Sequence, residues 1–306
     1  MNHFLNLIDQ PAERLRMLLA RAAALKADRK AGKPNAALSG KVIGLVFEKP
    51  SLRTRLSFEA GVAQLGGTSL FLPGNEIGLG WREPLPDFAR VTSRFLDGLV
   101  LRVFRQETVD AMAQYGTVPV VNGLSDRSHP CQAMADLLTV QEEFGTAEGK
   151  TIAFIGDGNN VSMSLAVACG KLGADFILGC PKGYAFDDEF LKKYAAKVGE
   201  PLPTVMHDPA AAVRNADVIY TDVWTSMGQE AERDERLKKF AGFQLNEALL
   251  AKAPAHAKVM HCLPAHRGEE ITAGVVDGAR SVVFDQAENR LHAQKAILEW
   301  LLATVK

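Results

Sequence analysis

The sequence is poor in cysteine and has little net charge. Its 306 residues include only four cysteines, and none of them form a C-x-x-C pair. This spacing excludes a disulfide-rich scaffold and indicates a reducing compartment. The 35 basic and 36 acidic residues leave a formal charge of -1, so no global field favours nucleic acid or a membrane surface.

Long apolar runs are also missing. No stretch approaches the roughly 18 to 20 consecutive apolar residues that are needed to span a bilayer. Residues 1–30 carry acidic side chains throughout and contain no apolar run of signal-peptide length. We therefore expect a cytoplasmic protein.

The stretch FIGDGNNVSMS lacks the third glycine of a dinucleotide-binding fingerprint. Gly156 and Gly158 follow a predicted strand, but Val161 stands where G-x-G-x-x-G requires glycine. A nicotinamide-dependent oxidoreductase is therefore disfavoured. Asn159 and Asn160 instead stand at the predicted strand's carboxyl end, where their side chains can hold a small ligand.

Short apolar runs alternate with segments of helical periodicity along the whole chain. This alternation predicts an α/β protein with two doubly wound parallel-sheet domains joined by interdomain helices. The expected domains are residues 1–145 and 146–286, with a helix over 129–145 as the link. A last strand is expected at the apolar run SVVFD, residues 281–285. A C-terminal helix over 287–306 is then expected to pack back on the first domain.

The stretch FEKPSLRTRLSFE places positive charge at the start of a predicted helix. Pro50 and Ser51 are typical of a helix start, so the free N–H groups of the first turn lie at the end of a strand. Arg53 and Arg55 add bidentate donors and Thr54 adds a hydroxyl group. Together these groups suit a phosphate or a similar dianion.

Two expectations depend on the packing of this helix. Downstream, Leu56, Ala60 and Ala63 are expected to form an apolar stripe, which leaves the first turn free to face a ligand. The alternative is a solvated helix start whose arginines pair with Glu48 and Glu59.

Two further segments place polar side chains near strand ends. In SHPCQ, His129 precedes a helix and can donate to a carbonyl oxygen, with the amide of Gln132 one turn further; the alternative is a structural role at the helix start. Arg102 in VLRVF interrupts an apolar strand, so it either ends the strand or faces a charge.

The stretch HCLPAHRGEE follows a predicted strand and has three interpretations. Cys262 with His261 or His266 is a candidate zinc site, although the ligand number and spacing do not match a four-ligand site. Cys262 is also a candidate nucleophile if a base lies within reach. In the third interpretation, the turn presents Cys262 and backbone carbonyl groups to a substrate amine.

The stretch TDVWTSMGQE contains a further pair of polar candidates. Asp222 and Ser226 flank an apolar pair, and Gly228 permits a tight loop. An ordinary loop between a strand and a helix is the alternative to a ligand site.

Together these motifs resemble the aspartate/ornithine carbamoyltransferase family, and within it the ornithine-specific branch. SLRTR, HPCQ, GDGNN, DVWTSMG and HCLPAHRGEE occur in the family's order and extend over nearly the whole chain. The resemblance implies transfer of the carbamoyl group from carbamoyl phosphate to the side-chain amine of L-ornithine, giving L-citrulline and phosphate in arginine metabolism. It also implies a homotrimer or a multiple of it, and leaves biosynthetic and catabolic use open.

The resemblance assigns roles to individual residues. The implied catalytic residues are Arg102, His129 and Cys262. The implied carbamoyl phosphate-binding residues are Ser51, Leu52, Arg53, Thr54, Arg55, Arg102, His129, Gln132, Cys262, Leu263 and Arg290. The implied ornithine-binding residues are Asn160, Asp222, Ser226 and Met227. No metal, cofactor, nucleic acid or membrane partner is implied.

One loop, over residues 73–86, departs from the family's pattern. Family members commonly place a glutamine before R-G-E-P, in a loop that reaches the carbamoyl phosphate of a neighbouring subunit. Here IGLGWREP puts Gly78 at that position and adds Trp81. Either the contact is lost, or Trp81 or Arg82 makes it, or Trp81 packs at the interface.

Alternative functions are distinguished by single features of the sequence. Carbamoyltransferases for putrescine or an N-acylated ornithine are the nearest alternatives, and Asp222 favours a free amino acid because it can face an α-ammonium group. A non-catalytic phosphate-binding protein would keep the arginines and lose His129 or Cys262. Both are present, which favours an enzyme.

Overall fold

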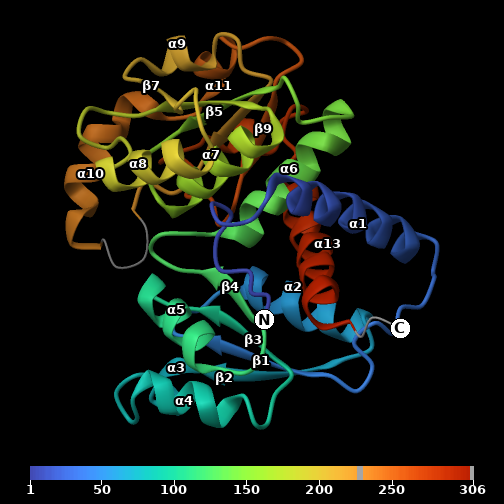
Figure 1. Cartoon of the computed structure of the whole chain (residues 1–306). Helices are drawn as coiled ribbons and strands as arrows, with labels where there is room; N and C mark the ends of the chain where they lie inside the picture. The colour runs from blue at the N-terminus through green and yellow to red at the C-terminus, as the bar shows by residue number, and fades with distance from the viewer. Residues whose placement is uncertain (226–229, 304–306) are drawn as a thin grey trace. The chain divides into compact units, whose positions relative to one another are not determined.

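The computed structural model describes residues 1–225 and 230–303, which form two compact units. Unit 1 comprises Met1–Leu138 and Glu288–Lys306, and unit 2 comprises Thr139–Ala287. The boundaries lie inside α6 (Pro130–Phe144) and α13 (Val283–Leu302), so each of these helices contributes residues to both units (Figure 1). Each unit contains one parallel sheet, which confirms the α/β class predicted from the alternating pattern.

Unit 1 is built on a four-stranded parallel sheet with the order β2-β1-β3-β4. Its strands are β1 (Val42–Phe47), β2 (Thr68–Pro73), β3 (Gly98–Arg102) and β4 (Val120–Leu124). Besides α6 and α13, its helices are α1 (Ala12–Lys30), α2 (Leu52–Gln64), α3 (Gly74–Ile77), α4 (Leu85–Thr92) and α5 (Gln106–Tyr115). The runs of β1, β3 and β4 are buried on both faces, as expected when helices cover both sides of a parallel sheet, whereas the edge strand β2 is only partly buried.

The two faces of this sheet have different helical partners. On one face, α4 and α5 bury a core that includes Val46, Phe88, Leu101, Val109 and Met112. On the other face α13 approaches β3 closely, because a Cβ atom at Gly98 would lie 3.2 Å from the side chain of Leu302. The same helix approaches α2, where a Cβ atom at Gly61 would lie 3.3 Å from Cγ of Lys295.

The predicted apolar stripe of α2 is wrong. Leu56 is 54% exposed, and Ala60 and Ala63 are exposed as well. The buried side of the helix instead contains Thr54, Ser57, Phe58, Gly61 and Val62. This face is selected by the close approach of α13, which sequence periodicity within α2 does not reveal.

Unit 2 is built on a five-stranded parallel sheet with the order β7-β6-β5-β8-β9. Its strands are β5 (Thr151–Ile155), β6 (Asp175–Gly179), β7 (Thr204–Met206), β8 (Val218–Thr221) and β9 (Lys258–His261). Its further helical segments are α7 (Asn160–Leu172), α8 (Asp188–Lys197), α9 (Pro209–Val213), η1 (Glu230–Glu232), α10 (Arg233–Phe240), η2 (Ala241–Phe243), α11 (Glu247–Leu250) and α12 (Ala273–Val276).

Aromatic and aliphatic side chains divide the core of unit 2 between its two faces. Phe154 stacks on Tyr220 at a centroid distance of 5.2 Å and also approaches Phe176. Ile155, Ile219 and other strand residues pack in a separate cluster with α9, α11 and α12. The predicted strand SVVFD is wrong, because Ser281 forms only an isolated bridge with Val259 and α13 begins at Val283.

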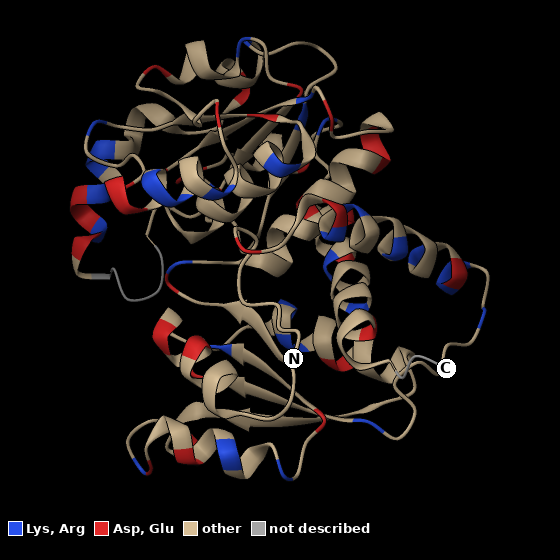
Figure 2. Ribbon diagram, in the orientation of Figure 1, with Lys and Arg blue, Asp and Glu red and all other residues tan. Residues whose placement is uncertain are grey.

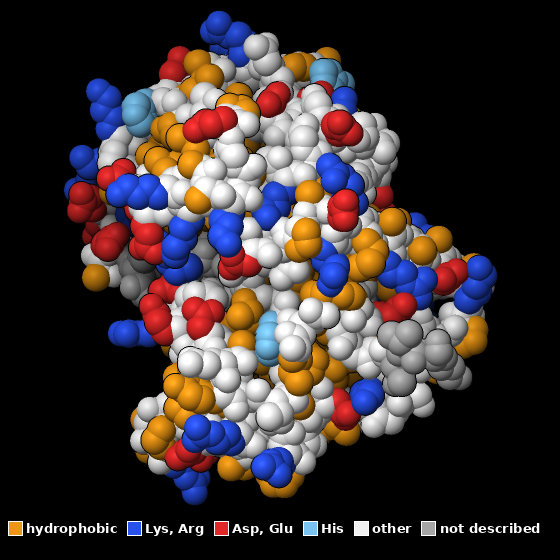
Figure 3. Space-filling model, viewed as in Figure 1, with side chains coloured by type: hydrophobic (Ala, Val, Ile, Leu, Met, Phe, Trp, Pro, Cys, Tyr) orange, Lys and Arg blue, Asp and Glu red, His pale blue; other side chains and the backbone are white. Residues whose placement is uncertain are grey.

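Charged side chains of both signs are interspersed on the surface. On α10, acidic and basic residues follow one another along the helix (Figure 2). The face seen in Figure 3 likewise mixes positive, negative and hydrophobic side chains. Among the described residues, no helix combines the length and the apolar character needed to cross a membrane.

Candidate functional site

The predicted site residues of unit 1 gather at the carboxyl ends of its strands. In the register of the sheet, Phe47 at the end of β1 is the partner of Arg102 at the end of β3. The chain leaves β1 towards β2 on one side and later returns to β3 on the other, so the strand order reverses between β1 and β3. Open α/β sheets bind their ligands at such a switch point.

Ser51 begins α2 as the sequence predicts. Its backbone is extended at φ -163° and ψ 110°, and its Oγ accepts a hydrogen bond from the N–H of Thr54. Ser51 also donates from Oγ to Oγ1 of Thr54 at 3.1 Å. The N-cap therefore fixes the buried Thr54 side chain beside the end of β1.

Two arginines converge on the Thr54 hydroxyl oxygen. Nη1 of Arg102 lies 3.5 Å from it, and Nη2 of Arg290 donates to it at 3.2 Å. Nη1 of Arg290 also donates to Oε1 of Gln132 at 2.6 Å. We call Ser51, Thr54, Arg102, His129, Gln132 and Arg290 the arginine cluster. It brings together side chains from the starts of α2 and α6, the end of β3 and the middle of α13.

His129 lies buried immediately before α6. Burial, together with the positive charges of Arg290 and Arg102, holds its pKa well below the usual value. The ring is therefore neutral at pH 7, with one N–H group that can donate to a carbonyl oxygen. Next to it, burial raises the pKa of Cys131 to about 12, so this thiol is inert.

The other predicted residues of the α2 start have different environments. Leu52 is 69% exposed and Arg53 is half-buried. Arg55 donates to Glu59 at 3.0 Å, and its guanidinium carbon lies 3.8 Å from the centre of the Phe71 ring. Arg55 therefore forms one of the pairs expected for the solvated alternative.

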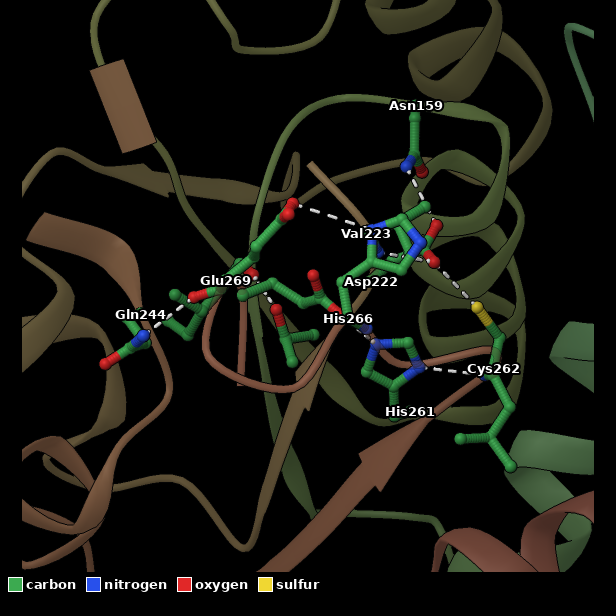
Figure 4. A network of polar contacts seen from close by, with 12 residues as sticks. Asn159, Asp222, Val223, Gln244, His261, Cys262, His266 and Glu269 are labelled. Atoms are coloured by element: carbon green, nitrogen blue, oxygen red, sulfur yellow. Dashed lines mark hydrogen bonds and ion pairs between the residues drawn. The ribbon is translucent and has the colours of Figure 1, made fainter. Parts of the chain in front are cut away.

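The predicted residues of unit 2 also gather at strand ends. Asn159 follows β5, Asp222 follows β8 and Cys262 follows β9, and Thr221 and His261 are partners in the sheet register. Figure 4 shows Asp222 between Asn159 and Cys262. We call Asn159, Asp222, His261, Cys262 and Glu270 the cysteine cluster.

Asp222 is the common acceptor of this cluster. The Cys262 thiol donates to Oδ1 at 2.8 Å, and the backbone N–H of Val223 donates to the same oxygen at 2.8 Å. Nδ2 of Asn159 donates to Oδ2 at 3.2 Å. These bonds fix the carboxylate and orient the thiol beside it.

His261 and Glu270 form a fully buried pair next to Cys262. Nε2 of His261 lies 3.1 Å from Oε1 of Glu270, and Nδ1 accepts from the N–H of Leu263 at 2.8 Å. Because Nδ1 accepts from Leu263, the ring proton lies on Nε2, which donates it to Glu270. Leu263 has φ 56°, a left-handed conformation that the bond to His261 stabilises.

The donor atoms of Asp222, His261 and Cys262 lie within 4.8 Å of one another, a spacing that a metal ion can bridge. However, both ring nitrogens of His261 are hydrogen-bonded and the Cys262 thiol donates to Asp222, so a metal ion would have to replace these hydrogen bonds. The same contacts engage the imidazole of His261, so the cluster favours a positioned thiol over a nucleophile activated by this histidine.

The remaining ornithine-binding candidates are placed only in part. Asn160 is the first residue of α7, and its carbonyl oxygen accepts from Oγ of Ser164 at 2.8 Å. Ser226 and Met227 lie outside the described residues.

The sequence interpretation did not identify an ion pair between the partly buried Asp157 and the buried Arg236. Arg236 donates to the Asp157 carboxylate and, from Nε, to the carbonyl oxygen of Trp224 at 2.8 Å. Burial raises the pKa of Asp157 to about 6, with the charge of Arg236 acting against it. The pair ties the GDGNN segment to α10. A lone charge in each of two distant segments gives no sequence signal of such a contact.

Gly78 has a conformational reason to be glycine. Its φ is 69°, and a Cβ atom there would lie 2.6 Å from Cβ of Arg82. The glutamine that the resemblance leads one to expect would be strained at this position. Trp81 is 76% exposed in the same loop.

Comparison with known proteins identifies two matching family models. Residues 2–142 match "Aspartate/ornithine carbamoyltransferase, carbamoyl-P binding domain", and residues 148–301 match "Aspartate/ornithine carbamoyltransferase, Asp/Orn binding domain". The chain is 50% identical over 301 residues to ornithine carbamoyltransferase of Desulfotalea psychrophila, covering 98% of this chain and 99% of that one. It is 49% identical over 301 residues to the anabolic ornithine carbamoyltransferase of Pyrococcus furiosus, covering 97% of this chain and 95% of that one.

Solved structures give the same result for the fold. The structure of ornithine carbamoyltransferase from Pyrococcus furiosus matches with a TM-score of 0.95 at 49% identity, over 100% of this chain and 98% of that one. The enzyme from Thermus thermophilus matches with a TM-score of 0.88 at 45% identity, over 97% and 98% of the two chains.

Proposed function

We propose that this chain, which belongs to the aspartate/ornithine carbamoyltransferase family, transfers the carbamoyl group from carbamoyl phosphate to the side-chain amine of L-ornithine, giving L-citrulline and phosphate. The observation that carries the proposal is the buried convergence of Arg102 and Arg290 on Thr54, beside a neutral His129. Such a set suits an anionic substrate that also has a carbonyl oxygen.

We assign carbamoyl phosphate to residues 1–145 and ornithine to residues 146–286, with residues 287–306 as a C-terminal helix of the first domain. The names of the two matching family models support this division. Arg290 supports the assignment of α13, since it bonds to Thr54 of α2 and Gln132 of α6.

In the carbamoyl phosphate site, Ser51, Leu52, Arg53, Thr54 and Arg55 hold the phosphate at the start of α2. The first-turn N–H groups and the guanidinium groups supply its hydrogen bonds. Arg102 and His129 donate to the carbamoyl oxygen, and Gln132 contacts the carbamoyl amide. Arg290, Cys262 and Leu263 complete the set.

In the ornithine site, Asn160, Asp222, Ser226 and Met227 bind the amino acid. Asp222 supports this role because it is a buried carboxylate that can face the α-ammonium group. Cys262, held by Asp222, contacts the reacting side-chain amine. A substrate with a free α-ammonium group is therefore preferred to an N-acylated ornithine, whose amide carries no positive charge.

The chemistry follows from these contacts. The neutral side-chain amine attacks the carbamoyl carbon, and negative charge develops on the carbonyl oxygen. Donors from Arg102, His129 and Thr54 stabilise this charge. Such electrostatic stabilisation is usually the largest single contribution to the rate enhancement of an enzyme. The C–O bond to phosphate then breaks, and the attacking nitrogen gives up one proton to the departing phosphate. The arginines hold the phosphate, so the reaction requires no cofactor or metal.

We further propose arginine biosynthesis as the pathway, a cytoplasmic location and a homotrimeric assembly or a multiple of it. The name of the anabolic relative from Pyrococcus furiosus supports the pathway. Exposed Trp81 supports an interface at the 73–86 loop, since a large exposed aromatic side chain is typical of interfaces.

A substrate comparison tests the activity. The purified chain is incubated with carbamoyl phosphate and, in parallel, L-ornithine, putrescine, L-lysine or N-acetylornithine, and the carbamoylated product is measured. We expect citrulline formation to exceed the other products. Preference for putrescine or N-acetylornithine would overturn the substrate assignment, and no product with any amine would overturn the enzymatic function.

The rate is expected to rise with pH. A lysine-like ammonium has a pKa of about 10.4, so the neutral amine increases up to about tenfold per pH unit between about pH 6 and 9. The lowered pKa of His129 keeps the ring neutral over this range, so His129 adds no titration of its own. Initial rates at subsaturating ornithine measure the profile. A flat profile, or a step near the ordinary histidine pKa, would contradict it.

A further inference from the structure

Gln294 contacts the arginine cluster from one turn further along α13. It is fully buried. With its amide oxygen towards Arg290, it accepts from Nη2 at 3.0 Å and from Nε at 3.2 Å, while its amide nitrogen donates to Oγ of Ser57 at 2.7 Å. The reverse orientation would direct the amide N–H groups at a guanidinium, which can only donate.

The hydrogen bonds around Gln294 have a fixed direction. Ser57 receives the amide N–H of Gln294 and donates to the carbonyl oxygen of Thr54 at 3.2 Å. On the other side of Arg290, Gln132 accepts through its oxygen and donates through Nε2 to Asp136 at 2.8 Å. An arginine can only donate and a carboxylate only accepts, so each glutamine amide has one permitted orientation.

The chain of bonds ties α2, α6 and α13 together at the carbamoyl phosphate site. Helix α13 lies close to α2, where Gly61 leaves room for Lys295. A second glutamine, Gln64, also bridges these two helices, because it accepts from Nζ of Lys295 at 3.0 Å. Gln64 is not part of the arginine cluster and therefore offers a matched comparison.

We propose that Gln294 is a positioning residue for carbamoyl phosphate, acting through Arg290. It holds the Nε edge of the guanidinium with a neutral acceptor, so the plane of the group is fixed while Nη1 and Nη2 reach Gln132 and Thr54. A carboxylate in the same place would compete with the phosphate for the charge of Arg290. This role rests on the proposed function, and it goes beyond it by naming a residue that contacts no substrate.

The test compares three variants by kinetics and by calorimetric titration with carbamoyl phosphate. Gln294→Leu removes the acceptor, Gln294→Glu adds a charge, and Gln64→Leu removes the other glutamine bridge. We expect KM and Kd for carbamoyl phosphate to rise about tenfold in Gln294→Leu, equivalent to about 1.4 kcal/mol, and further in Gln294→Glu. The KM for ornithine should change by less than about twofold in both Gln294 variants, because Gln294 does not contact the ornithine site. Gln64→Leu should match the wild type in all three values.

The outcomes separate the two proposals. Wild-type affinity for carbamoyl phosphate in both Gln294 variants would overturn the positioning role, as would an equal rise of both KM values. A wild-type chain that binds carbamoyl phosphate but forms no citrulline would instead overturn the proposed function. Gln294→Glu keeps the size and the acceptor oxygen of glutamine, so it decides the question if Gln294→Leu fails to fold.

Discussion

Replacing Arg102 by methionine is expected to lower kcat by about 10²- to 10³-fold, the range for loss of one donor to a developing oxyanion. Methionine replaces the unbranched apolar stem of the buried side chain and removes the guanidinium. In the structure Arg102 is the last residue of β3 and its Nη1 lies 3.5 Å from the Thr54 hydroxyl oxygen. The substitution should therefore slow the chemical step, and the effect should appear in kcat, which is measured at saturating substrate.

Steady-state citrulline formation measures this effect, with Arg105→Ala as the control. Arg105 is exposed three residues further along the chain, before α5, and its variant should keep kcat within about twofold. A normal kcat in Arg102→Met would remove Arg102 from the catalytic residues.

Replacing Asp222 by asparagine is expected to raise the KM for L-ornithine by about 10- to 150-fold, from the loss of about 1.5 to 3 kcal/mol for a hydrogen bond to a charged group. The substitution removes the charge that we propose faces the α-ammonium group. It keeps one acceptor oxygen for the Cys262 thiol and replaces the other, which accepts from Nδ2 of Asn159, with an amide group. The KM for carbamoyl phosphate should change much less.

Asp217→Asn is the matched control for this substitution. Asp217 precedes β8 and accepts from the backbone N–H of Thr151, whereas Asp222 follows the same strand at its other end. If the KM for ornithine rose equally in both variants, the effect would reflect the stability of β8 rather than substrate binding.

The start of α2 shows what the sequence could predict. Pro50 and Ser51 are local signals, and Ser51 caps the helix because its hydroxyl oxygen needs only the N–H three residues on. The alternation of strands and helices predicted both parallel sheets from local signals as well, since the strand runs are mainly apolar, as in GLVLR of β3 and TIAFI of β5.

The buried face of α2 could not be predicted in the same way. Leu56 and Ala60 have the spacing of a core stripe, yet the helix turns Thr54, Ser57 and Gly61 inwards. The reason is α13, which lies more than two hundred residues away in the chain and brings buried polar partners for this face. Polar groups that satisfy one another are buried at a lower cost than their composition suggests.

In the candidate site, too, local sequence signals predicted some features, whereas features that depend on distant contacts could not be predicted. Motif order predicted which residues follow each strand, and Arg102, Thr54 and Arg290 lie in contact. The contacts that orient them were not predictable, because Gln294 and Asp136 are ordinary helix residues until their partners are known. Arg55 is the opposite case, since its motif position suggests a ligand while its contacts are with Glu59 and Phe71.

The most direct test of phosphate binding at the α2 start is the calorimetric Kd for carbamoyl phosphate in the double variant Arg53→Ala/Arg55→Ala. Removing two charged donors should weaken binding by at least about 100-fold, with most of the loss in the Arg53→Ala single variant because Glu59 already engages Arg55. An unchanged Kd, together with unchanged citrulline formation, would contradict a dianion held by these guanidinium groups.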